Sequence, residues 1–89
     1  MTYDEVVDMA NQFRFGSKES KKTVALTITG LDNDGLIDLL ETSREVIFDN
    51  SGDDRLTLAM MDLIAFIYAE QSSRIVTSTF DKLGKFFKK

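Results

Sequence analysis

Apolar residues recur every three or four positions near the start of the chain, which is the spacing of one helix face. Thr2 can cap such a helix, and Glu5 follows at the spacing of a capping box. Gly16 and Ser17 are residues that end helices. We therefore predict a helix from Thr2 to Gln12. Its apolar face carries Val6, Met9, Ala10 and Phe13.

The second half of the chain predicts two further helices separated by a turn. The first covers residues 36–48 and is capped by one of the polar residues 32–34. Residues 49–52, with the sequence Asp-Asn-Ser-Gly, predict the turn. The aspartates at 53–54 then cap a long helix that extends toward Phe87.

Residues 23–29 fit two structures. Threonine alternates there with aliphatic residues, which is typical of a half-buried strand and agrees with intrinsic propensity. A helix would instead place Val24, Ile28 and Leu31 on one side. We expect a mainly helical single domain over residues 1–89, and the alternative is an α+β fold with a small hairpin near residues 12–29.

The long helix contains a stretch that is apolar around its whole circumference. From Leu58 to Ala69, Asp62 is the single polar residue. A helix in a small monomer buries one stripe, so the remaining apolar surface predicts contact with further copies of the chain. The alternative is that this helix is enclosed within a compact monomer.

The last part of the chain continues as an amphipathic helix with a basic polar side. Its apolar stripe contains Ile75, Val76, Thr79, Phe80, Leu83, Phe86 and Phe87, and its cations are Lys82, Lys85, Lys88 and Lys89. Such a helix can lie on a membrane or hold a partner. It can equally complete the core of its own chain and place cations at a helix C-terminus.

The composition excludes several kinds of chemistry. Without Cys there is no disulfide and no thiolate nucleophile, and without His the chain lacks the commonest zinc ligand and the side chain that titrates nearest neutrality. We therefore expect no enzymatic activity, no cofactor and no metal.

The start of the chain lacks a basic, apolar leader, and no segment reaches the roughly 18 apolar residues of a membrane span, so we expect a cytoplasmic protein without a membrane partner.

The candidate binding segment is a cationic island in a chain of net charge -4. Phe13 and Phe15 lie two residues apart, and Lys18, Lys21 and Lys22 follow them. Aromatic faces stack on nucleobases and ammonium groups neutralise phosphates, so this segment suits a small nucleotide-type ligand. The alternative is that Phe13 packs in the core and the lysines only solvate a loop.

Two acidic segments indicate other partners. Residues 30–41 have the acids, the sixth-position Gly and the twelfth-position Glu of a calcium-binding loop, although its first position is Gly30. The same residues can form a turn that caps a helix. The nine carboxylates between Asp32 and Asp62 can mimic nucleic acid and occupy a basic site on a host protein, or can form a solvated helix face.

The sequence from Asp4 to Phe15 resembles the N-terminus of the phage anti-CBASS sponges and their anti-Thoeris relatives. Those proteins open with a short helix bearing an aliphatic residue, Asp, a second aliphatic residue and Asn, followed by a Phe-x-aromatic triplet. The matching residues here are Val6, Asp8, Met9, Asn11, Phe13 and Phe15. Further matches are Asn50-Ser51, Leu58-Ala59-Met60 with Leu63, and Tyr68-Ala69-Glu70 with Arg74 downstream.

The resemblance implies a short N-terminal helix, two long antiparallel helices and a non-catalytic homo-oligomer of up to six copies. Such proteins sequester cyclic di- and trinucleotide messengers of bacterial immune enzymes in the host cytoplasm, so that effector proteins never receive the signal. We accordingly expect neither a membrane nor a nucleic acid polymer as partner. By the resemblance, Phe13 and Phe15 stack on bases, Lys18, Lys21 and Lys22 contact phosphates, and Arg74 serves a second site.

Overall fold

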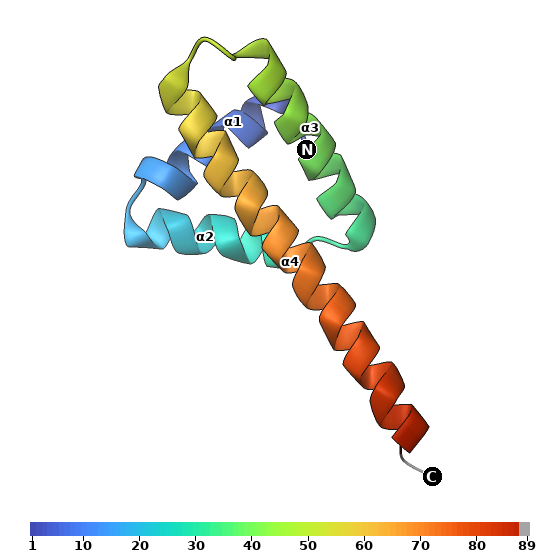
Figure 1. The fold of residues 1–89 in the computed structure, drawn as a ribbon. Helices are drawn as coiled ribbons and strands as arrows, with labels where there is room; N and C mark the ends of the chain where they lie inside the picture. Colours follow the sequence, from blue (N-terminus) through green and yellow to red (C-terminus); the bar gives the residue numbers. More distant parts are fainter. Residues whose placement is uncertain (88–89) are drawn as a thin grey trace.

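The computed structural model describes residues 1–87, with side chains as far as Lys85, and consists of four helices (Figure 1). These are α1 (Tyr3–Phe15), α2 (Lys18–Thr29), α3 (Asn33–Asp49) and α4 (Asp54–Phe87). The mainly helical fold is confirmed, and in the described part of the chain no helix is long and apolar enough to cross a membrane. The features expected of the Phe86, Phe87, Lys88 and Lys89 side chains lie outside the described residues.

The helices α1, α2 and α3 pack against the first half of α4, and the four helices together form a bundle. A short turn joins α3 to α4, so the two helices run in opposite directions (Figure 1). The helices α1 and α2 cross α4 and also contact it. At 34 residues, α4 is about 51 Å long, which accounts for the 56 Å length of the molecule. The second half of α4 therefore projects beyond the other three helices (Figure 1).

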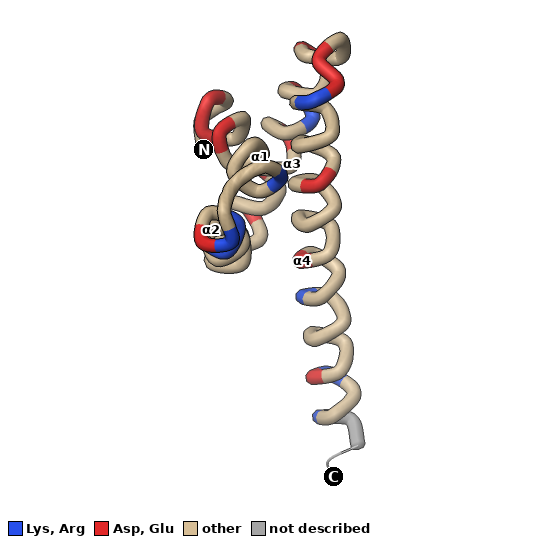
Figure 2. Tube along the Cα trace, turned by 90° about the vertical axis from the view of Figure 1, so that its left-hand side faces the viewer, with Lys and Arg blue, Asp and Glu red and all other residues tan. Residues whose placement is uncertain are grey.

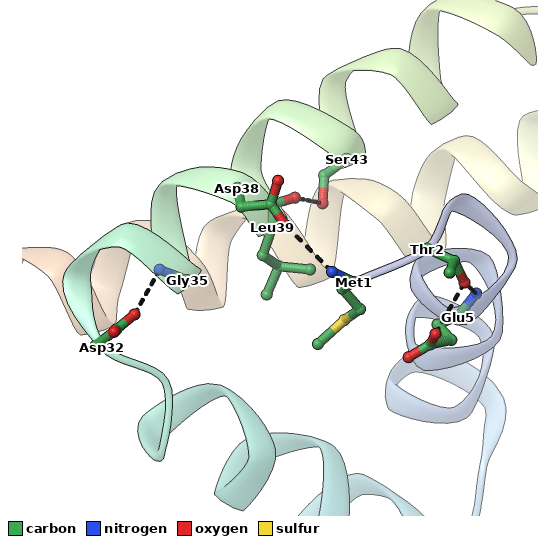
Figure 3. A network of polar contacts seen from close by, with 8 residues as sticks. All are labelled: Met1, Thr2, Glu5, Asp32, Gly35, Asp38, Leu39 and Ser43. Carbon is green, nitrogen blue, oxygen red and sulfur yellow. Dashed lines mark hydrogen bonds and ion pairs between the residues drawn. The ribbon is translucent and has the colours of Figure 1, made fainter.

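Polar residues cap the helices at the positions that the sequence predicts. The Thr2 hydroxyl accepts a hydrogen bond of 3.3 Å from the Glu5 backbone N–H, and it donates one of 3.0 Å to the Glu5 carboxylate (Figure 3). Asp32 caps α3 by accepting a 2.7 Å bond from the Gly35 N–H, and Asp53 caps α4 in the same way. Each cap satisfies a backbone donor that would otherwise lack a partner, and each contributes about 1 kcal/mol.

The strand and hairpin considered for residues 12–29 are wrong, because residues 18–29 form α2. The threonines satisfy their hydroxyls within the helix: Thr23 donates to the Glu19 carbonyl and Thr27 to the Thr23 carbonyl, both at 2.9 Å. Val24 and Ile28, one turn apart, are buried against the other helices. This burial outweighs a β propensity that differs among residues by only about 1 kcal/mol.

Twelve apolar side chains form the core. They are Val6 and Ala10 of α1, Val24 and Ile28 of α2, Leu36, Leu39, Leu40 and Val46 of α3, and Ala59, Met60, Leu63 and Ile67 of α4. The buried hydroxyl of Ser43 donates 2.7 Å to the Leu39 carbonyl, so it carries no unmet hydrogen-bond demand. Among the described side chains, every core residue of α4 lies before residue 70, which leaves the projecting half without cover as far as Lys85.

The outer side of α4 is exposed, so the enclosed monomer considered for residues 58–69 is not what the structure forms. Leu58, Met61 and Tyr68 are each about half exposed, and further along Phe80 is 68% exposed. The described apolar side chains of residues 75–83 therefore do not complete the core of their own chain.

Candidate functional site

The end of α1 brings its two aromatic rings into different environments. Phe13 packs edge-on against Phe66 of α4, with ring centroids 5.3 Å apart and an interplanar angle of 65°, and it borders the hydrophobic core. Phe15 is 42% exposed. Of the two rings, Phe15 is therefore the one with a surface open to a ligand, whereas Phe13 joins α1 to α4.

Arg55, in the first turn of α4, covers part of the Phe15 ring. Its guanidinium carbon lies 4.0 Å from the ring centroid, which is a cation–π contact. Such a contact contributes about 0.5–1 kcal/mol at an exposed position, so a ligand can displace it at small cost. The pair places a planar cation and an aromatic face at one point on the surface, where α1 ends and α4 begins.

A shallow hollow of about 460 Å³ adjoins this pair. Its lining residues are Val7, Asn11, Phe15, Asp53, Arg55 and Leu56. Val7 and Leu56 supply apolar walls, and the Asn11 amide can both donate and accept hydrogen bonds. The hollow can thus hold one planar polar ring beside a cation, and its volume lies in the lower part of the range of ligand pockets, about 300–1,000 Å³.

Arg14 lies between the two aromatic residues in the sequence, but it does not line the hollow and instead contacts Asp62 of α4. The two groups form a salt bridge of 2.8 Å, and each side chain is about 40% exposed. An exposed pair of this kind contributes between about 0 and 1 kcal/mol. Its geometric effect is to hold the C-terminal turn of α1 against α4.

The three candidate lysines lie in the first turns of α2. Ser17 caps this helix by accepting a hydrogen bond of 3.2 Å from the Ser20 N–H. Lys18, Lys21 and Lys22 are three and four positions apart, share one side of α2 and are exposed. None of them forms an ion pair within the part of the chain that the structure describes, and Figure 2 shows cationic segments of α2 in blue.

Arg74 lies away from the other candidates and links three helices. It donates 3.0 Å to Glu70 on α4, 3.1 Å to the Asn33 side chain on α3 and 3.2 Å to the Thr29 carbonyl at the end of α2. It also borders a groove of about 540 Å³ between α3 and α4. Because three of its five N–H donors are engaged within the chain, the structure gives Arg74 a structural task at the α2–α3 corner.

The geometry of residues 30–41 does not support a calcium-binding loop. Residues 33–41 belong to α3, and the Asp32 carboxylate is used as the cap of that helix. Among the residues that the structure describes, no group of three or more His, Cys, Asp or Glu side chains could hold a metal ion. The interpretation of this run as a helix-capping turn is confirmed.

The comparisons with known proteins supply no family for this chain. No protein-family model, no curated protein and no solved structure matches it. The site is therefore defined by its geometry alone. Sequence reasoning missed Arg55 as a site residue, because 40 positions separate it from Phe15 and the packing of α1 on α4 is what brings them together.

Proposed function

We propose that this chain is a non-catalytic, self-associating protein that sequesters cyclic oligonucleotide messengers and thereby blocks a bacterial anti-phage immune pathway. The contact between Phe15 and Arg55 carries this proposal. It joins a partly exposed aromatic face to a guanidinium at the edge of a hollow large enough for a base. A base stacks on the ring, and the guanidinium meets a phosphate oxygen pair.

The lysines of α2 add positive charge beside the hollow, whose own lining contains one cation, Arg55, and one carboxylate, Asp53. Lys18 follows Phe15 by three residues, so their Cα atoms are at most about 11 Å apart. Lys22 lies one helical turn further, about 6 Å along the axis of α2. A ligand seated on Phe15 therefore has ammonium groups within reach of its phosphates.

The energies divide the binding between stacking and charge. One stacked base contributes about 1–3 kcal/mol. A micromolar dissociation constant corresponds to about -8 kcal/mol, so the phosphate contacts must supply most of the remainder. Binding should accordingly weaken as salt is added, because exposed cations are screened over about 10 Å at 0.1 M ionic strength.

A binding role makes no demand for a nucleophile or a general base, and the chain has neither His nor Cys. Sequestration instead requires enough sites to lower the free concentration of the messenger. Each copy of the chain supplies one hollow, so capacity increases with the number of copies.

The experiment is isothermal titration calorimetry of the protein with cyclic dinucleotides and trinucleotides, with linear dinucleotides as the ligand control. Phe15→Ala and Arg55→Ala should each lower affinity at least tenfold. Phe48→Ala is the matched control, since Phe48 is 82% exposed on α3 and borders no part of the hollow. Replacing Lys21 and Lys22 together by Glu should also abolish binding. The absence of heat with every cyclic ligand, from protein that circular dichroism shows to be helical, would reject the proposal.

A second candidate function rests on the outer face of α3. Its five exposed carboxylates recur every three or four residues, so they form one acidic line along the helix: Asp34, Asp38, Glu41, Glu45 and Asp49. The Met1 amine lies 3.2 Å from the Asp38 carboxylate (Figure 3). The other four carboxylates of the line are exposed. Such a line can occupy a basic, nucleic-acid-binding surface of another protein.

The two candidates are separable because they use different helices. Replacing Asp38, Glu41 and Glu45 by Lys should abolish competition with DNA for a purified DNA-binding protein. The same change should leave cyclic nucleotide binding at the Phe15 hollow intact.

A further inference from the structure

The helix α4 carries two apolar faces. One is buried against α1, α2 and α3. On the opposite side runs a row of exposed residues that we call the α4 seam: Leu58, Met61, Ala65, Ala69, Ser72, Val76, Phe80 and Leu83. In Figure 2, the charged positions of α4 beyond its first turns lie toward the other helices, and the opposite edge of the tube is uncharged.

The seam has a regular and symmetric spacing. Successive members are separated by three, four, four, three, four, four and three residues. A 3-4-4 repeat advances 11 residues in three turns, so the row keeps to one face of a nearly straight helix. The order of intervals is the same in both directions, about a midpoint between residues 70 and 71. The mirrored pairs are Leu58 with Leu83, Met61 with Phe80, Ala65 with Val76, and Ala69 with Ser72.

We propose that two copies of this chain pair antiparallel through their α4 seams. A two-fold axis at the midpoint brings each member of a mirrored pair opposite the other, as an isologous contact requires. Small residues at the centre, Ala69 and Ser72, let the helices approach closely. The larger residues toward both ends then fill the space between the helices, and the bundles of the two copies lie on opposite outer sides.

The charge along α4 favours the antiparallel direction. Residues 1–70 have fourteen carboxylates and six cations, a net charge of -8, whereas residues 71–89 have one carboxylate and five cations, a net charge of +4. Within α4 itself, residues 54–70 have three carboxylates and one cation, so an antiparallel pair places the basic half of each α4 beside the acidic half of its partner, and a parallel pair would place like charges together. The helix dipoles act in the same direction.

The size of the exposed surface also suits a second copy. The large apolar side chains of the seam are Leu58, Met61, Val76, Phe80 and Leu83, each 45–68% exposed. Together they leave on the order of 500 Å² of apolar surface, which is the size of the largest patch on a typical monomer, about 300–600 Å², and such patches are often functional. A stable interface buries about 800 Å² per partner. The seam spans about 38 Å, so two copies can cover one another along its whole length.

This pairing is the geometry that we infer for the self-association in the proposed function. It does not require the ligand to be bound. In the antiparallel pair, Arg55 of one copy lies at the level of residue 86 of the other copy, near the basic end of that helix. The two Arg55 residues lie roughly 46 Å apart along the axis, so each hollow holds its own ligand. Loss of pairing and loss of ligand binding are therefore separate outcomes.

The test uses single cysteines, because the natural chain has none. Ala65→Cys and Val76→Cys each replace an exposed seam residue and create no core cavity. In the antiparallel pair, residue 65 faces residue 76 of the partner. Two copies of residue 65 are offset by 11 residues, or about 16 Å, which is too far for a disulfide. Under mild oxidation we expect a covalent dimer from the mixture of the two variants and none from either variant alone.

A charge in the seam provides a second measurement. Phe80→Glu should convert the dimer seen in sedimentation equilibrium to a monomer, with a dissociation constant raised at least a hundredfold. Ser78→Glu, exposed and about 160° around the helix from Phe80, is the matched control and should remain dimeric. Self-cross-linking of either single variant would indicate a parallel pair and overturn the proposal. A wild-type monomer at 100 μM would overturn it too, including one that binds anionic phospholipid vesicles through the seam.

Discussion

The hydroxyl of Tyr3 accepts a hydrogen bond of 2.8 Å from the side-chain amide of Asn50, 47 positions later in the chain. This bond ties the first turn of α1 to the residue that ends α3, and the same amide also donates 2.8 Å to the Val46 carbonyl. The N-terminal helix is thereby fixed to the turn from which α4 begins. The position of the hollow between α1 and α4 depends on this attachment.

Tyr3→Phe removes the acceptor and keeps the ring. We expect the free energy of unfolding to fall by about 0.5–1.5 kcal/mol, the net worth of a partly buried hydrogen bond. Urea unfolding followed by circular dichroism measures the change. The matched control is Tyr68→Phe, whose hydroxyl accepts an exposed 2.8 Å bond from Arg44 and should matter less. Equal losses from both variants would contradict the attachment role of Tyr3.

The helical register of α2 predicts different costs for two neighbouring aliphatic residues. Ile28 is fully buried, whereas Leu26 is 62% exposed. Ile28→Ala should therefore lower the free energy of unfolding by about 2–5 kcal/mol, and Leu26→Ala should change it by about 0.5 kcal/mol or less. In a strand both side chains would lie on the same face, so similar losses from the two variants would indicate an extended segment.

Gly16 lies where the corner between α1 and α2 is tightest. A Cβ atom there would collide with the Gln12 carbonyl oxygen and would lie 2.9 Å from the Cβ of Ser20. Gly16→Ala should thus force the corner open and cost about 1–3 kcal/mol in thermal or urea unfolding. Gly84→Ala is the control, since no atom lies within 4 Å of its added Cβ and alanine favours the helix. A harmless Gly16→Ala would show that the two helices do not meet this closely.

Arg74 should act on stability and leave ligand binding unchanged. Arg74→Ala removes bonds to Glu70, Asn33 and the Thr29 carbonyl, and we expect a loss of about 1.5–3 kcal/mol in urea unfolding. Arg74→Lys should recover only part of this, because an ammonium cannot reproduce the planar guanidinium contacts. The dissociation constant for cyclic nucleotides should change less than twofold. A large loss of affinity with unchanged stability would instead make Arg74 a ligand contact.

Local chemistry in the sequence was sufficient to predict the helices that begin with strong caps. Thr2 with Glu5, Asp32 and Asp53 are all used as caps, since a cap involves residues only two or three positions apart. Repeating apolar residues likewise identified the inward face of α1, where Val6 and Ala10 are buried. These signals lie within one or two helical turns, so no knowledge of the rest of the chain was needed to interpret them.

Tertiary structure decided what depends on residues distant in sequence. Residues 23–29 are helical because the bundle buries Val24 and Ile28 together, a gain that no local preference reveals. The sequence also did not show that Phe13 packs against Phe66 while Phe15 stays partly exposed beside Arg55. These contacts form only when α1 packs on α4. The apolar content of α4 was evident from the sequence alone. Which of its sides is covered follows from where three short helices can reach, and they cover one face of its first half.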